Sequence, residues 1–117
     1  MDNYISIYLM DVYMAIVAVE SFFKDYPMRY DVFVNDSLRR SAVERKTEIM
    51  GEAINRILKI DPSFPLPHAR QIVNTRNRII HAYDSVQPEF LWSLVINHIP
   101  QLKKDIIKIF EAENIEY

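Results

Sequence analysis

The chain has 117 residues, of which 50% are hydrophobic and 26% are charged, and its formal net charge is −2. These values are typical of one globular domain, and they exclude a disordered chain and a strongly basic nucleic-acid coat protein. Cysteine is absent, which excludes disulfides, thiolate nucleophiles and cysteine-ligated zinc. The single glycine and the scarcity of strand and turn signals favour an all-α fold.

A first helix is expected from about Asn3 to Lys24, ending before Pro27. This run is apolar enough to resemble a membrane span, but Asp11 lies in its middle, where a carboxylate costs roughly 3 kcal/mol in a bilayer. A buried core helix therefore explains the run better. The run also lacks the basic start and small-residue cleavage site of a signal peptide, so we do not expect it to be one. Because apolar residues surround nearly the whole cylinder, we expect burial on several sides, one of them a candidate subunit interface.

A second long helix is expected to end at about Ile60, after a connector at residues 28–34 with room for one helical turn. Asn35, Asp36 and Ser37 are the candidate N-caps. Apolar residues recur at helical spacing at Ala42, Ile49, Met50, Ala53, Ile54 and Ile57. The only glycine, Gly51, lies inside this helix at a cost of up to about 1 kcal/mol relative to alanine. We therefore predict that another helix packs closely against Gly51.

Three prolines at residues 61–67 predict a loop, and a third helix follows from about Pro67 to Tyr83. Residues 84–87 form a short turn, and Pro88 suits the first position of a fourth helix. Pro100 should kink or split that helix near Asn97. Short connections between long helices predict a single domain over residues 1–117, an antiparallel up-and-down four-helix bundle.

The third helix carries the candidate chemistry. At about 100° per residue, one stripe holds Ala69, Ile72, Val73, Arg76, Ile79, Ile80 and Tyr83. A second, polar stripe holds Arg70, Asn74, Asn77 and His81. An arginine within an apolar stripe must be paired, or must face a cleft or a subunit interface. The simplest alternative to a catalytic role is a structural salt bridge to Glu48 or Glu52.

Arg76, Asn77 and His81 together suit metal-independent cleavage of RNA. An imidazole accepts the proton of a ribose 2′-hydroxyl, a guanidinium binds the phosphate, and an amide orients either group. By itself, His81 near a helix C-terminus often only complements the helix dipole. Arg76 and His81 also lie about 140° apart on an ideal helix. They converge only if the long arginine side chain folds around the helix surface, if the end of the helix is distorted, or if a second subunit supplies one of the two residues.

The sequence lacks the motifs of metal sites, phosphate-binding loops and serine-type catalysis. The three histidines, His68, His81 and His98, lie on different segments without the spacing of metal ligands. The sequence has no glycine-rich phosphate loop and no Ser-His-Asp arrangement. We therefore expect neither a metal nor another cofactor.

Residues 76–83 read RNRIIHAY, in which Arg is followed by four residues, His, one residue and Tyr. This pattern resembles that of the HepT branch of the HEPN superfamily. Residues 41–53, SAVERKTEIMGEA, and 84–102, DSVQPEFLWSLVINHIPQL, are similar to its second and fourth helices. The resemblance covers roughly residues 5 to 110.

The resemblance implies a dimeric helical bundle in which the motifs of two subunits line one cleft. It implies a ribonuclease toxin that needs no metal, whose partner is a minimal nucleotidyltransferase (MNT-type) antitoxin, with larger complexes formed when that partner binds. In some such systems the antitoxin transfers AMP to the tyrosine of the motif. The implied roles are catalysis for Arg76 and His81, support for Asn77, AMP acceptance for Tyr83, and cleft lining for Asp11, Glu48 and Glu52.

Two rival interpretations remain open at this stage. In one, the chain is a non-catalytic nucleotide- or substrate-binding subunit of a nucleotidyltransferase complex. In the other, it is a plain helical dimerisation domain in which Arg76 forms a core salt bridge and Tyr83 completes the apolar stripe. All three interpretations are compatible with a cytoplasmic protein, and none reveals which RNA is cleaved.

Overall fold

The computed structural model describes residues 1–81 and 87–117, and at Ile80 and His81 it describes the backbone alone. The predicted turn at residues 84–87 therefore lies largely outside the described residues. The elements are α1 (Asn3–Phe22), α2 (Tyr30–Val34), α3 (Ser37–Ile60), α4 (Ala69–His81), α5 (Pro88–Ser93), a π-helical turn η1 (Leu94–His98) and α6 (Ile99–Ala112). No strand occurs within the two described ranges. The predicted all-α bundle is confirmed.

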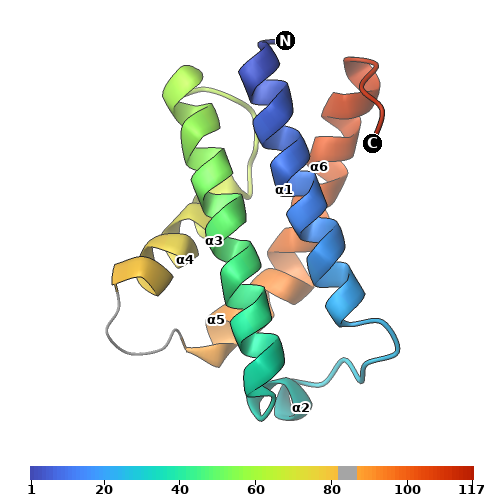
Figure 1. The fold of residues 1–117 in the computed structure, drawn as a ribbon, viewed down its shortest axis with the longest axis vertical. Coiled ribbons are helices and arrows are strands. Elements are labelled where there is room, and N and C mark those ends of the chain that lie inside the picture. The colour runs from blue at the N-terminus through green and yellow to red at the C-terminus, as the bar shows by residue number, and fades with distance from the viewer. Residues whose placement is uncertain (82–86) are drawn as a thin grey trace.

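Three long helices run along the long axis of the molecule (Figure 1). α1 is antiparallel to α3 and α6, as short connections predict. α4 is shorter and inclined, and it crosses behind α3. α3 packs chiefly against α1 and α4, so it is the central helix of the bundle. The helix that carries the RNRIIHAY motif therefore rests on α3.

α1 buries one face, formed by Ile5, Leu9, Val12, Ala15, Ile16 and Val19. Its N-terminus is capped by Asp2, whose Oδ1 accepts hydrogen bonds from the backbone N–H groups of Tyr4 and Ile5 at 2.8 and 3.1 Å. Ile7 and Met14 are 56% and 61% exposed. The expected burial on several sides is therefore not found within one chain. By length and composition alone, α1 could also cross a membrane.

α3 begins and ends where the sequence predicts. Asp36 is the N-cap, and its Oδ1 accepts a hydrogen bond from the backbone N–H of Arg39 at 3.0 Å. The core face differs in detail, because Val43 and Thr47 are buried while the predicted Ala42 and Ile49 are half-buried. The hydroxyl of Thr47 donates to the carbonyl oxygen of Val43 at 2.8 Å, so this buried polar group is satisfied.

Gly51 is buried where α3 meets α4, as predicted. A Cβ added at this position would overlap Arg76 Cβ and lie 2.7 Å from Arg76 Cγ. It would also lie 3.4 Å from the carbonyl oxygen of Ile72. The absent side chain therefore lets the two helices approach closely at Arg76, which offsets the cost of glycine in a helix.

Pro88 occupies the first turn of α5, as predicted. The expected kink before Pro100 is a π-helical turn, in which the backbone N–H of Ile99 donates to the carbonyl oxygen of Leu94. Proline has no N–H to donate to the carbonyl four residues earlier, so a wider turn at this point relieves the helix.

The short helix α2 attaches the α1–α3 connector to α5 through aromatic packing. Phe33 is fully buried, and its ring centroid lies 5.1 Å from that of Trp92 and 5.9 Å from that of Phe23. Aromatic pairs at these separations stabilise a core beyond the area that they bury. The predicted turn in the connector is thus a structural element with its own core residue.

Candidate active site

Arg76 lies on α4 with its guanidinium half-buried beside the neighbouring amide. Its Nη1 donates to Asn77 Oδ1 at 3.0 Å. Its Nε, like the Nε of Arg40 on α3, is buried without a hydrogen-bond partner among the described residues. A buried donor without a partner is unfavourable, so a bound anion at Arg76 would satisfy it.

The two carboxylates that could have neutralised Arg76 are engaged elsewhere. Glu48 pairs with Arg45 at 3.0 Å, and Glu52 pairs with Arg56 at 2.8 Å. Within residues 1–81 and 87–117, no ion pair involves Arg76. The alternative of a core salt bridge from Arg76 to Glu48 or Glu52 is therefore wrong for this conformation.

His81 is the last residue of α4, and its side chain lies outside the described residues. Tyr83 lies outside them altogether. The backbone stays α-helical from Arg76 through His81, so these two positions lie about 140° apart around the axis of α4. Within the described backbone, the end of α4 is therefore not distorted.

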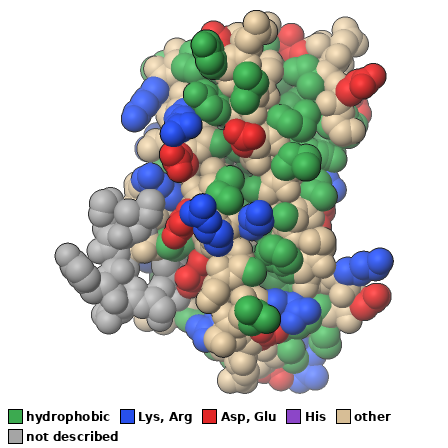
Figure 2. Space-filling model, viewed as in Figure 1, with side chains coloured by type: hydrophobic (Ala, Val, Ile, Leu, Met, Phe, Trp, Pro, Cys, Tyr) green, Lys and Arg blue, Asp and Glu red, His purple; other side chains and the backbone are tan. Residues whose placement is uncertain are grey.

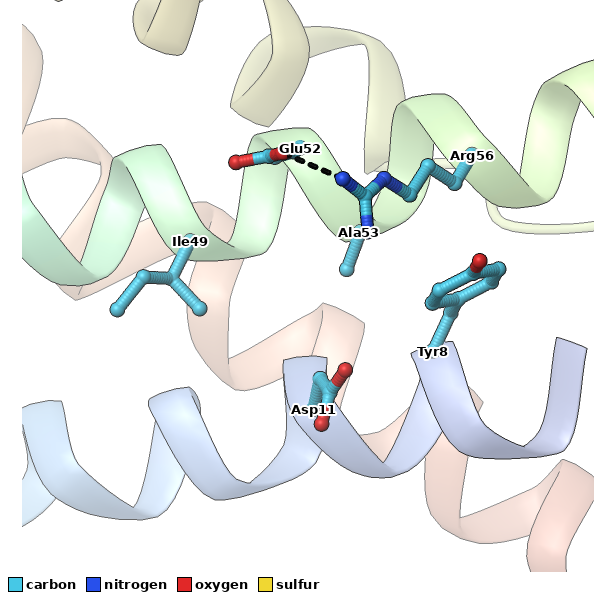
Figure 3. Close-up of a pocket in the computed structure, with 6 residues that line it drawn as sticks. All are labelled: Tyr8, Asp11, Ile49, Glu52, Ala53 and Arg56. Atoms are coloured by element: carbon cyan, nitrogen blue, oxygen red, sulfur yellow. Dashed lines mark hydrogen bonds and ion pairs between the residues drawn. The ribbon is translucent and has the colours of Figure 1, made fainter. Parts of the chain in front are cut away.

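Two of the three predicted acidic residues line one pocket between α1 and α3 (Figure 3). This pocket has a volume of about 160 Å³ and is bordered by Tyr8, Asp11, Ile49, Glu52, Ala53 and Arg56. In Figure 3 the guanidinium of Arg56 lies against Glu52, and Asp11 faces them from α1. Glu48 does not line this pocket, and neither does Arg76. Within one chain, Asp11 and Glu52 thus line a pocket between α1 and α3, whereas Arg76 contacts α3 at Gly51.

Sequence reasoning missed the pairing of two histidines. His68 precedes α4 and His98 ends the π-helical turn, yet their Nδ1 atoms lie 3.2 Å apart. Burial, and to a smaller extent the neighbouring His68, lowers the pKa of His98 below its usual value. Among the described residues, no group of three or more metal-ligating side chains gathers in one place. Spacing alone could not reveal the pair, because only the inclination of α4 brings the two segments together.

The fold and the site define a helical-bundle protein in which Arg76 contacts the amide of Asn77 and has no ion-pair partner within residues 1–81 and 87–117. The chain belongs to the HepT-like ribonuclease family, whose model matches residues 13–109. The resemblance inferred from the motif is confirmed.

Curated relatives span nearly the whole chain. A putative RNase of Methanocaldococcus jannaschii is 31% identical over 92% of this chain and 91% of its own length. A second putative RNase of that organism is 34% identical over 85% of this chain and 90% of its own. A probable ribonuclease HepT of Thermococcus cleftensis is 33% identical over 87% of this chain and 92% of its own. No solved structure gives a significant match.

Proposed function

We propose that the chain is a single-domain, cytoplasmic, metal-independent endoribonuclease toxin that cleaves RNA with Arg76 and His81. The observation that carries the proposal is the half-buried guanidinium of Arg76, which has an amide beside it and no carboxylate partner among the described residues. The family, and relatives named as putative or probable ribonucleases, support RNA as the substrate.

The chemistry needs no metal ion. The imidazole of His81 takes the proton of a ribose 2′-hydroxyl, and the 2′-oxygen attacks the adjacent phosphorus. The bond from phosphorus to the 5′-oxygen of the next nucleotide breaks, and that oxygen takes up a proton. Arg76 stabilises the extra negative charge on the phosphoryl oxygens, and Asn77 holds the guanidinium in place. The products are a 2′,3′-cyclic phosphate and a 5′-hydroxyl.

A homodimer would complete this site. Arg76 and His81 diverge by about 140° on one helix, so a cleft shared by two subunits allows a histidine to face the arginine of its partner. α1 supports such an interface with exposed Ile7 and Met14, and Leu38 at the start of α3 is 81% exposed. Apolar and charged groups alternate on the face viewed in Figure 2. Asp11, Glu48 and Glu52 lie on these two helices and would line the shared cleft.

A minimal nucleotidyltransferase antitoxin would silence the enzyme by transferring AMP to Tyr83, alone or within a larger complex of both proteins. Tyr83 lies two residues past His81 in the sequence. An AMP group there adds bulk and a negative phosphate beside the RNA site, so it opposes RNA binding by blockage and by charge repulsion. The modified chain would be a phosphoprotein.

Co-expression tests the toxin and its silencing together. Expression of the chain alone should arrest growth, and co-expression of a minimal nucleotidyltransferase should restore growth and add the mass of one AMP to the peptide containing Tyr83. A Tyr83→Phe chain should remain toxic beside the partner. If the chain binds the nucleotidyltransferase but never arrests growth or cleaves RNA, it is a non-catalytic subunit and the proposal fails.

A further inference from the structure

Two histidines from segments 30 residues apart meet beside the start of α4. His68 is the last residue before α4, and His98 is the last residue of the π-helical turn η1. Their Nδ1 atoms lie 3.2 Å apart while their ring centroids lie 5.4 Å apart, so the rings present these nitrogens to each other. Both side chains are half-buried, which leaves the pair accessible to a small solute.

The backbone holds each histidine in place. Ala69, directly after His68, is buried, and its N–H donates to the carbonyl oxygen of Leu66 at 3.1 Å. Ile99, directly after His98, is also buried, and its N–H closes the π-helical turn. Because both rings are attached to anchored backbone, the pair loses little conformational freedom when it binds a ligand.

The separation of the two nitrogens suits a metal ion that both of them bind. Zinc binds an imidazole nitrogen at about 2.0–2.1 Å, and two such bonds that meet at about 103° span the 3.2 Å between the Nδ1 atoms. That angle is near the tetrahedral angle that zinc prefers in proteins. Binding requires each ring to turn its Nδ1 lone pair from the other ring towards the ion, which half-buried rings can do.

Neutral polar groups surround His98. It lines a pocket of about 160 Å³ between α4, α5 and η1, which has room for water molecules that complete the coordination of an ion. The neutral polar side chains that line it with His98 are Gln71, Asn74, Thr75 and Ser93. Arg78 also lines it, with its guanidinium carbon 4.3 Å from the centre of the Phe90 ring. A nearby cation weakens metal binding, so we expect an exchangeable site.

The chemistry of the two ligands selects the class of metal. Imidazole nitrogen binds zinc, nickel and copper well, whereas magnesium and calcium prefer oxygen ligands. Among the described residues, no third histidine, cysteine or carboxylate joins this pair. The pair is therefore not a closed structural site with four protein ligands, and water must fill the remaining positions.

We propose that His68 and His98 bind one divalent transition-metal ion of the zinc, nickel and copper class through their Nδ1 atoms. The ion joins the start of α4 to the junction of η1 and α6, and so stabilises the inclined position of α4. Neither histidine belongs to the proposed cleavage site. The inference is therefore independent of the proposed ribonuclease function, and cleavage itself remains metal-independent.

Thermal unfolding of the chain, purified without a polyhistidine tag, tests this site. Zn²⁺ at ten times its Kd should raise Tm by about 5 °C, because the ion binds only the folded arrangement of the pair. Mg²⁺ at the same concentration should leave Tm unchanged. Calorimetric titration should give one zinc ion per chain. Half an ion per chain would overturn the inference, because two copies would then share the ion.

Substitution of each histidine in turn locates the ion. His68→Gln and His98→Gln should each abolish the zinc-dependent rise in Tm. His81→Ala is the matched control, because it removes the third histidine and should keep the rise. An equal rise in the His98→Gln chain, or loss of the rise in the His81→Ala chain, would place the ion elsewhere and overturn the inference.

Nitrogen NMR of the unsubstituted chain keeps the test valid even if a variant fails to fold. With isotope-labelled histidine, zinc should shift the Nδ1 resonances of two rings and leave the third histidine unchanged. Shifts at Nε2, or at one ring only, would contradict the proposed ligands.

Failure of this site is distinguishable from failure of the proposed function. A chain that binds zinc through His68 and His98 but cleaves no RNA keeps the metal site and loses the ribonuclease. A chain that cleaves RNA in EDTA but shows no zinc-dependent rise in Tm keeps the ribonuclease and loses the metal site.

Discussion

Gly51 of α3 lies directly against the first two side-chain carbons of Arg76 on α4. A Cβ at Gly51 would overlap Arg76 Cβ and lie 2.7 Å from its Cγ. The Cβ of Arg76 is held by the backbone of α4, so it cannot move away from Gly51 without moving that helix. The glycine therefore sets the distance between the two helices at the residue proposed to bind the scissile phosphate.

Gly51→Ala should destabilise the fold and reduce cleavage. Overpacking costs about 1–3 kcal/mol, and the gain in helix propensity offsets up to about 1 kcal/mol of it. We expect a net loss of unfolding free energy in urea, with a larger loss of cleavage rate because Arg76 shifts. Ser41→Ala, on the exposed side of α3, is the control. An alanine variant more stable than the natural chain would refute the close contact.

Arg76→Met should abolish cleavage while leaving the fold intact. Methionine keeps the aliphatic contact with Gly51, and no described carboxylate loses a partner. Unfolding free energy should change by less than about 1 kcal/mol, while the cleavage rate falls by about 10²–10³-fold. Arg29→Met, in the exposed pair with Asp31, should alter neither. A loss of about 3–5 kcal/mol would instead indicate a broken buried ion pair.

Met14→Glu should dissociate the proposed homodimer. Met14 is 61% exposed on the open apolar face of α1, and a carboxylate there would be buried without a partner in any interface formed by that face. Sedimentation equilibrium should give a monomer with an unchanged helical circular dichroism spectrum. Ile96→Glu, at an exposed apolar residue of η1, is the matched control. A Met14→Glu chain that still dimerises would assign the interface to another surface.

The histidine pair should make stability fall at mildly acidic pH. The pKa of His98 is lowered in the folded chain, so the unfolded chain binds a proton first as the pH falls below about 6.5. The folded state consequently loses stability below that pH and is unaffected above it. His98→Gln should flatten this part of the profile in urea unfolding at pH 5 to 8. An unchanged profile in the variant would contradict a partly buried His98 whose pKa is lowered by folding.

Much of the fold follows from local sequence signals. Asp36 caps the N-terminus of α3, and Pro88 lies in the first turn of α5, both as predicted. The regular helix is also interrupted before Pro100, as predicted. The close approach at Gly51 was also predictable, because only a packing contact explains a glycine inside a helix.

Features that depend on how the helices are inclined were not predictable. The inclination of α4 brings His68 to His98 and opens the pocket beside Phe90, and neither leaves a periodic signal in the sequence. The apolar residues all round α1 predicted burial on several sides, but hydrophobicity does not distinguish a core within the chain from an interface with another molecule. The ion-pair partners of the acidic residues could not be predicted either. Glu48 pairs with Arg45 and Glu52 pairs with Arg56, and neither pairs with Arg76.

The most direct test of the account is cleavage of a labelled single-stranded RNA by the purified chain in EDTA, beside its His81→Ala variant. Mass spectrometry first establishes that Tyr83 is unmodified. We expect the unsubstituted chain to release fragments ending in a 2′,3′-cyclic phosphate and the variant to release none. Cleavage that requires an added divalent metal, or equal cleavage by both chains, would contradict a metal-independent site built on Arg76 and His81.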